Sequence, residues 1–254
     1  MQTVRLTLVY DGTDFSGFQI QIGRRTVQQT VEEAIERVTG VFARISGAGR
    51  TDAGVHALGQ VVGFRTESLL PISVLARAID AQLPEDVGIA EAATVDANFH
   101  ARFSARGREY RYSIANASER PILDRKFAYH WRSRLDATRM HDVAQEFAGP
   151  HDFAVFCGSL RGRDRPTSTV RTIYRIACWR EGDRVLIDTA ANAFLPQMVR
   201  NLVGTLIRAG MNQVDEAGVR SMLSGTGARV PTVTAPAHGL CLTRVWYDSP
   251  GEDF

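Results

Sequence analysis

The densest group of glycine and polar residues is the segment Gly47–His56, with the sequence GAGRTDAGVH. Its three glycines allow unusual backbone angles and let a ligand approach the main chain closely. Between two strands, such a loop would present Arg50, Asp52 and His56 together. A carboxylate beside an arginine keeps a low pKa and stays ionised, as a nucleophile or a base must. The alternative is a tight turn in which Asp52 accepts backbone hydrogen bonds, and the segment lacks the lysine of a phosphate-binding loop.

Other polar residues are weaker candidates for chemistry. Asp11 and Asp14, in the sequence DGTD, can bind a divalent cation, but such residues after a strand more often form a turn, which we favour. No histidine has a second histidine at ligand spacing, so we expect no metal site. Three cysteines, Cys157, Cys178 and Cys241, lie far apart and form no C-x-x-C, which argues against a disulfide framework or a zinc site. We expect Cys157 to be a core thiol.

Hydrophobic periodicity predicts the elements that position these residues. In the first hundred residues, Thr26 and Gln29 form a capping-box pattern before an apolar helical stripe that ends at Gly40. The remaining predicted elements are strands at Val4–Tyr10, Val41–Ile45, Gln60–Arg65 and Val87–Ala93, and a helix at Ile72–Gln82. The resulting order is β-α-β-β-α-β.

The second half repeats this order with longer insertions. Strands are predicted at Arg108–Ala115, Val170–Trp179, Arg184–Ala190 and Leu240–Tyr247, and helices at Asp136–Ala148, Phe194–Gly210 and Asp215–Leu223. A turn at Glu181-Gly182-Asp183 should join two of the strands. Pro196 is expected in the first turn of its helix, where proline is tolerated.

The length and composition limit the class of protein. A chain of 254 residues, 44% hydrophobic and 23% charged, fits one large α/β unit or two closely packed halves, and argues against a disordered or collagen-like protein. No run of 18 apolar residues is present, so we expect no membrane span. The segment Met1–Tyr10 has no apolar signal region, and we expect a cytoplasmic protein. We favour two related α+β halves, residues 1–104 with the aspartate loop and residues 105–254 with a basic surface.

Charge is unevenly distributed along the chain. The net charge is +2, but residues 1–100 carry 8 basic and 12 acidic side chains, whereas residues 101–254 carry 22 and 16. All basic residues except Lys126 are arginines, which bind phosphates and stack on bases. The segments 101–134 and 161–168 are arginine-rich, and we expect the second to be a mobile loop that contacts RNA. A GC-rich genome would also favour arginine over the whole surface, and composition does not separate the two explanations.

The segment GAGRTDAGVHA (Gly47–Ala57) resembles the signature of the tRNA pseudouridine synthase A (TruA) family. The resemblance extends over nearly the whole chain, through further motifs in family order. These are YDGTDFSGFQ (Tyr10–Gln19), VQQTVEEAI (Val27–Ile35), DANFHARFSARGREYRY (Asp96–Tyr112), HDFAVF (His151–Phe156), MVRNLVG (Met198–Gly204) and APAHGLCL (Ala235–Leu242).

The resemblance implies an isomerase that converts uridine to pseudouridine at positions 38, 39 and 40 of the tRNA anticodon stem-loop. It implies an α+β fold of the pseudouridine synthase type, in which two related ferredoxin-like halves share a mixed, mainly antiparallel central sheet flanked by helices. It also implies a homodimer whose subunits together hold the anticodon arm of one tRNA, with no metal and no organic cofactor.

The same motif match assigns roles to four residues. Asp52 matches the catalytic aspartate, and Tyr110 the residue whose ring stacks on the target base. Arg50 matches the arginine that helps to displace the base, and Arg200 the basic partner of the catalytic carboxylate. Asp52 could attack C1′, add to C6 of the uracil or remove a ribose proton, and the sequence does not choose among these. One departure is Pro196-Gln197 before MVRN, where the family often has a histidine; we expect it to change detail and not the reaction class.

Three other functions stay open at this point. A tRNA-binding chaperone would remodel the anticodon arm without isomerisation. A metal-dependent phosphohydrolase would use Asp11, Asp14 and Asp52, although the sequence lacks the histidine and carboxylate clusters of such enzymes. A sibling synthase would act on other uridines or other RNAs.

Overall fold

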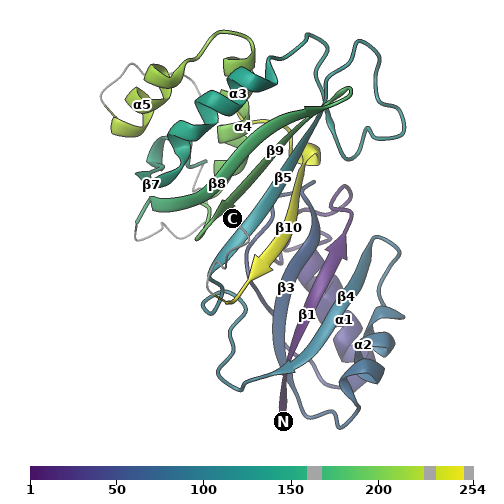
Figure 1. The fold of residues 1–254 in the computed structure, drawn as a ribbon. Helices are drawn as coiled ribbons and strands as arrows, with labels where there is room; N and C mark the ends of the chain where they lie inside the picture. The colour runs from purple at the N-terminus through teal and green to yellow at the C-terminus, as the bar shows by residue number, and fades with distance from the viewer. Residues whose placement is uncertain (159–167, 226–232, 249–254) are drawn as a thin grey trace. The chain divides into compact units, whose positions relative to one another are not determined.

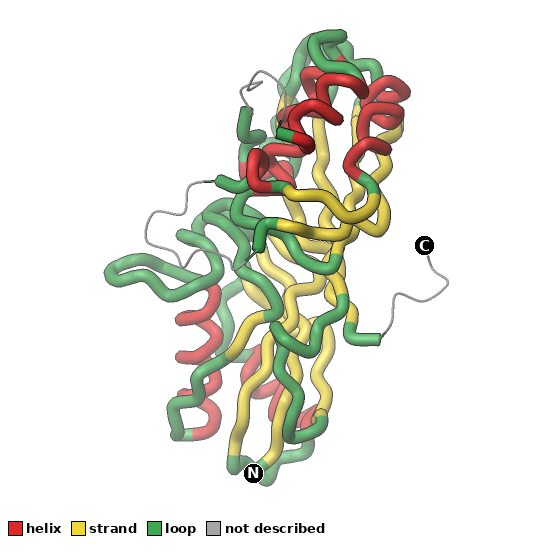
Figure 2. Tube along the Cα trace, turned by 90° about the vertical axis from the view of Figure 1, so that its left-hand side faces the viewer, coloured by secondary structure: helices red, strands yellow, loops and turns green. Residues whose placement is uncertain are grey.

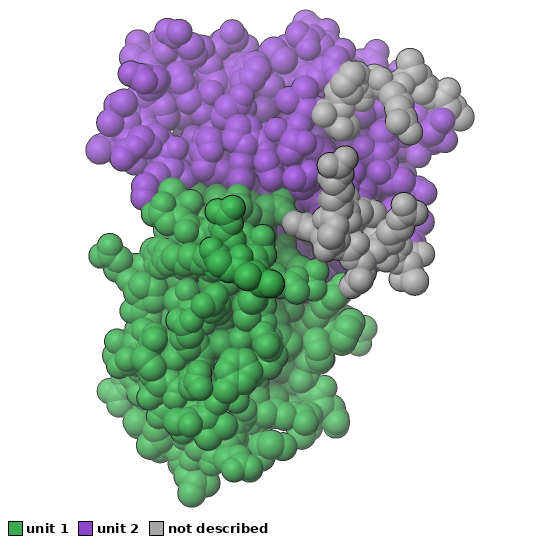
Figure 3. Space-filling model, turned by 180° about the vertical axis from the view of Figure 1, so that it is seen from behind, with its two compact units in different colours: residues 1–106, 241–249 green, residues 107–240, 250–254 purple. Residues whose placement is uncertain are grey.

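The computed structural model describes residues 1–158, 168–225 and 233–248, and within them the chain forms ten strands and five α-helices (Figures 1 and 2). Most strand pairs are antiparallel, which confirms the predicted α+β class. The chain divides into two compact units, coloured in Figure 3: unit 1 is residues 1–106 and 241–249, and unit 2 is residues 107–240 and 250–254. Apart from Ser168, the arginine-rich segment 161–168 lies outside the described residues.

Unit 1 contains a sheet with the strand order β4–β1–β3–β10, with β2 paired to β3. Its strands are β1 (Gln2–Tyr10), β2 (Ser46–Gly47), β3 (His56–Thr66), β4 (Val87–Val95) and β10 (Leu240–Trp246). The central strand β1 is antiparallel to both β3 and β4. Strand β10 joins β3 in parallel through Cys241 and Leu242, so this strand belongs to unit 1 although it lies in the expected C-terminal half, 105–254.

Two helices complete unit 1, α1 (Val27–Thr39) and α2 (Ile72–Asp80). Helix α1 lies behind the sheet in Figure 1 and beside it in Figure 2, and its apolar stripe is buried. It ends at Gly40, as predicted, because Gly40 adopts a left-handed φ of 72° that glycine tolerates best.

The predicted capping box at the start of α1 is wrong. Thr26 is the N-cap residue, but its side chain makes no capping hydrogen bond. Instead, the main-chain N–H groups of Val27 and Gln28 donate to the carbonyl oxygens of Gly17 and Phe18, at 3.2 and 2.9 Å. The preceding loop therefore satisfies the helix N-terminus, a tertiary contact that no local pattern reveals.

The predicted strand Val41–Ile45 is also absent, and β2 begins only after it. Val41 is 67% exposed, and its N–H donates to the hydroxyl of Thr39 at 3.3 Å. At the other end, the N–H of Ile45 donates to Glu32 Oε1 at 3.0 Å. Because side chains take these donors, the segment does not pair as a strand.

Unit 2 contains the strand order β5–β9–β8–β7, all antiparallel, with β6 parallel to β5. Its strands are β5 (Gly107–Ala115), β6 (Tyr129–His130), β7 (Gly149–Asp152), β8 (Val170–Glu181) and β9 (Arg184–Ala191). Strands β8 and β9 form the predicted hairpin, which turns at Gly182 with a φ of 56°.

Three α-helices and three short 3-10 turns accompany these strands. The helices are α3 (Ala137–Ala144), α4 (Met198–Gly210) and α5 (Glu216–Ser224), and the 3-10 turns are η1 (Gln145–Phe147), η2 (Ala154–Phe156) and η3 (Ala237–Gly239). Helix α3 packs on both β8 and α4. Among the described residues, no helix is long and apolar enough to span a bilayer.

Helix α4 starts four residues later than predicted. Gln197, its N-cap residue, has a φ of 58°, which interrupts the helical geometry expected from Phe194 onward. Pro196 consequently precedes the helix instead of occupying its first turn, and its carbonyl accepts the N–H of Gly158 at 2.8 Å.

Candidate active site

Arg50 and Asp52 lie in unit 1 on the loop of residues 48–55, which connects β2 to β3. Arg50 is exposed and Asp52 is half-buried, whereas Thr51 and Val55 in the same loop are buried. The loop is thus packed onto the unit at its apolar positions while it carries an arginine and an aspartate nearer the surface.

Main-chain hydrogen bonds fix the loop on both sides of the aspartate carboxylate. Phe18 N donates to Thr51 O at 3.1 Å, and Val55 N donates to Asp52 O at 3.1 Å, which closes a turn. Gly54, inside this turn, has a φ of 79°. The turn is thus closed through the main-chain oxygen of Asp52.

Two buried side chains form hydrogen bonds with the loop. Tyr10, at the end of β1, places its hydroxyl 2.8 Å from Thr51 Oγ1, and Gln60 in β3 donates from Nε2 to Gly49 O at 2.9 Å. Burial raises the pKa of the Tyr10 phenol to about 12. The sequence patterns do not single out either residue, although a glutamine inside the apolar run of a strand is a signal that its amide is used.

The turn after β1 packs against the same loop. Asp11 Oδ1 accepts hydrogen bonds from the N–H and the hydroxyl of Thr13, which is the turn-forming role that we favoured for it. His56 is 5% exposed, and its Nδ1 lies 3.0 Å from Gly12 N and 3.2 Å from Asp11 Oδ1. The prediction that the loop presents His56 beside its other charged residues is therefore wrong, because the imidazole is buried where β3 begins.

The described part of the chain contains no group of three or more His, Cys, Asp or Glu residues placed to hold a metal ion. Asp14 is exposed. Cys157 is only half-buried, short of the core position expected for it, whereas Cys178 is buried and its burial raises the pKa of the thiol. None of the three cysteines forms a disulfide.

Tyr110 lies in unit 2, on β5, opposite Thr189 of β9. The side chain is 8% exposed, and its ring meets Phe194 edge-to-face with the ring centroids 5.2 Å apart. This contact fixes the orientation of the aromatic ring.

Arg200 also lies in unit 2, in the first turn of α4. Its Nε donates to Ala235 O at 2.7 Å, while Ala235 N donates to Arg200 O at 3.1 Å. The residue is half-buried, so this two-way link ties the helix to the segment that leads into η3. The four predicted site residues therefore belong to two units: Arg50 and Asp52 share one loop of unit 1, and Tyr110 and Arg200 lie on different elements of unit 2.

Part of the arginine-rich segment 101–134 has a structural role. Arg111 makes a two-pronged ion pair with Asp188, at 2.7 Å for each bond, and Arg108 donates to Asn192 O at 2.9 Å. Some of these arginines therefore stabilise the sheet of unit 2.

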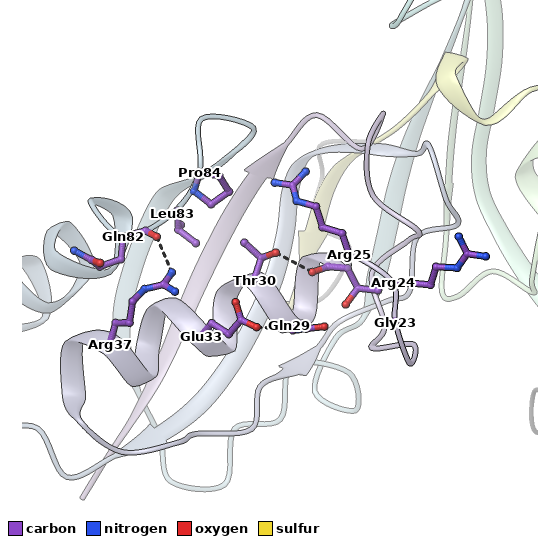
Figure 4. A pocket seen from close by; sticks show the side chains of 11 residues that line it. Gly23, Arg24, Arg25, Gln29, Thr30, Glu33, Arg37, Gln82, Leu83 and Pro84 are labelled. Atoms are coloured by element: carbon purple, nitrogen blue, oxygen red, sulfur yellow. Dashed lines mark hydrogen bonds between the residues drawn. The ribbon is translucent and has the colours of Figure 1, made fainter.

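A groove of about 600 Å³ runs beside α1 in unit 1 (Figure 4). Two of its arginines bind other residues of the chain. Arg25 makes a two-pronged ion pair with Asp86 at 2.6 and 2.7 Å, and Arg37 donates to Gln82 O at 3.0 Å. The groove is lined by residues 23–26, 29, 30, 33, 37 and 82–84, which do not include the predicted site residues.

Comparison with known proteins identifies the family. A family model described as tRNA pseudouridine synthase matches residues 8–104 and 143–248. A protein named tRNA pseudouridine synthase A from Roseiflexus sp. (strain RS-1) is 45% identical over 99% of this chain and 93% of its own, and one of the same name from Halalkalibacterium halodurans is 40% identical over 94% and 90%.

A solved structure, the crystal structure of the archaeal box H/ACA sRNP Nop10-Cbf5 complex, matches 81% of this chain and 43% of its own chain at 14% identity. Its TM-score of 0.36 is too low to support a conclusion. The family model and the two relatives cover both units, and on that basis the chain belongs to the tRNA pseudouridine synthase family, a family of isomerases.

Proposed function

We propose that this protein isomerises uridine to pseudouridine at positions 38, 39 and 40 of the tRNA anticodon stem-loop, with Asp52 as the catalytic residue. Family membership supports the reaction, and the names of the relatives support tRNA as the substrate. The observation that carries the proposal is the setting of Asp52, a half-buried carboxylate on a loop that is anchored on both sides and lies within the first matched segment.

The reaction breaks the glycosidic bond between N1 and C1′, turns the uracil and joins C5 to C1′; C5 loses its proton and N1 gains one. Asp52 starts this sequence by attacking C1′, by adding to C6 or by removing a ribose proton. Each of the three routes needs an ionised carboxylate held in a fixed position against the nucleoside. No oxidant, metal or organic cofactor enters this balance.

We assign substrate roles to three further residues. A uridine must leave the helical stack before it can react, which costs a few kcal/mol, and a stacking ring lowers that cost. Tyr110 supplies the ring, and its contact with Phe194 keeps the ring oriented. Arg50, exposed on the aspartate loop, helps to displace the base, and Arg200 acts as the basic partner that favours the ionised carboxylate.

We also propose a cytoplasmic homodimer in which the basic half, residues 105–254, lines the tRNA-binding groove. The excess of basic residues in 101–254 supports this assignment, because phosphate contacts supply most of the affinity for a nucleic acid. Light scattering on the purified protein tests the dimer, with a monomer at assay concentrations as the contradicting result.

The decisive experiment maps pseudouridine by carbodiimide labelling of an unmodified tRNA that carries uridines at positions 38 to 40. Wild type, Asp52→Asn and Asp14→Asn are compared, each with and without EDTA. Asp14→Asn is the matched control, because it removes an exposed carboxylate from the same unit. We expect modification by wild type and Asp14→Asn, and none by Asp52→Asn, which should still bind the tRNA.

Each other outcome identifies a rival. Binding without modification by wild type would favour the chaperone, and modification at other uridines only would favour a sibling synthase. Activity that EDTA abolishes would favour metal-dependent chemistry. Full activity of Asp52→Asn would remove Asp52 from the reaction.

A further inference from the structure

A continuous chain of buried hydrogen bonds lies under the Asp52 loop. Gln60, which is fully buried in β3, places Nε2 3.4 Å from the hydroxyl of Tyr10, and that hydroxyl lies 2.8 Å from Thr51 Oγ1. Thr51 is the residue directly before Asp52. The chain therefore begins in the sheet and ends next to the proposed catalytic residue.

Chemistry sets the direction of one of these hydrogen bonds. An amide nitrogen only donates, so the Tyr10 oxygen accepts from Gln60 Nε2, while either hydroxyl can donate in the bond between Tyr10 and Thr51. Because burial raises the pKa of this phenol to about 12, the proton stays on Tyr10 at ordinary pH.

Thr51 is held by both its side chain and its main chain. Its hydroxyl meets Tyr10, and its carbonyl oxygen accepts the N–H of Phe18 at 3.1 Å. On the other side of the aspartate, Val55 N closes the turn onto Asp52 O. These contacts hold the main chain on both sides of Asp52.

We propose that Tyr10 is a positioning residue for Asp52: its hydroxyl holds Thr51, and Thr51 holds the aspartate where the nucleoside reacts. This inference rests on the proposed role of Asp52. Tyr10 itself is 3% exposed and acts through Thr51, without touching the substrate. A displacement of about 1 Å in a reacting group can cost about a hundredfold in rate, so the loss of one such hydrogen bond should lower kcat.

The test compares Tyr10→Phe with Tyr247→Phe. Both changes remove one phenolic hydroxyl from unit 1, but the hydroxyl of Tyr247 donates to Ala101 O at 2.9 Å, whereas that of Tyr10 lies 2.8 Å from Thr51 Oγ1 in the Asp52 loop. Pseudouridine formation gives kcat and KM, and melting temperature reports stability. We expect Tyr10→Phe to lower kcat about tenfold with KM unchanged. Tyr247→Phe should keep the wild-type kcat. The melting temperatures of the two variants should be similar.

Substitutions at Thr51 test the same link from its other end. Thr51→Ser keeps the hydroxyl and should retain most of the activity, whereas Thr51→Val keeps the shape, loses the hydroxyl and should match Tyr10→Phe. The double variant Tyr10→Phe/Thr51→Val should be no slower than the slower single variant, because both changes break one bond.

The results separate this inference from the proposed function. Wild-type kcat in Tyr10→Phe, equal losses in Tyr10→Phe and Tyr247→Phe, or a change confined to KM would overturn the positioning role while Asp52 stays catalytic. A wild type that forms no pseudouridine in any tRNA would remove both proposals.

Discussion

The two glycines of the Asp52 loop, Gly49 and Gly54, differ in backbone conformation. Gly54 has a φ of 79°, so alanine at this position must adopt a left-handed conformation that costs about 1–2 kcal/mol. Gly49 lies outside that region, and a Cβ built on it has no neighbour within 4 Å. Gly49→Ala should therefore change the free energy of unfolding by less than about 0.5 kcal/mol.

These free energies correspond to a measurable difference in melting temperature. For a protein of this size, about 1–2 kcal/mol lowers the melting temperature by roughly 2–8 °C. Gly54→Ala should show a decrease in this range by circular dichroism, and Gly49→Ala should melt within about 2 °C of wild type. Both variants are then assayed for pseudouridine formation.

Gly49→Ala also tests whether the loop contacts the substrate, because Gly49 lies between Ala48 and the exposed Arg50. If Gly49→Ala keeps its stability and loses activity, the added methyl group meets the tRNA and not the protein. If Gly49→Ala and Gly54→Ala lose the same stability, the loop geometry on which the positioning argument depends is incorrect.

Three further predictions follow from the contacts described above. Asp136→Ala removes the side-chain cap on Arg139 N and should lower the free energy of unfolding, measured in urea, by about 1 kcal/mol. Thr26→Val should lower it by less than about 0.5 kcal/mol, because the Thr26 side chain makes no capping hydrogen bond. Equal losses in the two variants would contradict this prediction. The native state binds the Tyr10 proton more tightly than the unfolded state, so stability should fall by about 2 kcal/mol as the pH rises from 10 to 12, and Tyr10→Phe should lose this part of the decline. Affinity for tRNA, measured by filter binding, should fall steeply with added salt, and a flat salt response would argue against phosphate contacts.

Local patterns predict the strands whose burial alternates. Strand β5 buries alternate residues along much of its length, and the β8–β9 hairpin has a glycine where its backbone needs a positive φ. The same patterns fail at Val41–Ile45, where apolar residues suggest a strand. The N–H of Ile45 is taken there by Glu32, a partner 13 residues away. The apolar content of that segment was therefore not a measure of its burial.

The sequence likewise predicts some features of the candidate site and misses others. Composition predicts a glycine-rich loop with Arg50 and Asp52, because charged residues among glycines do not form a packed strand. It does not predict the anchors, since Tyr10 lies 41 residues before Thr51 and the two meet only when β1 and β3 pair. His56 was misplaced for a related reason: the sequence shows it beside the loop, while the fold buries it against the turn that follows β1.

These anchors bear on the choice between a binding protein and an isomerase. A protein that only binds RNA gains affinity from an exposed charge, and small movements of that charge cost it little. The proposed isomerase must hold one carboxylate in a fixed position against the nucleoside while the glycosidic bond breaks, the uracil turns and the new bond forms. A shift of the loop between these steps would lower the rate. The Asp52 loop has a partly buried hydrogen bond at Gly49, a buried one at Thr51 and a turn closed by Val55. These contacts would hold the Asp52 loop in place, as the role proposed for Asp52 requires.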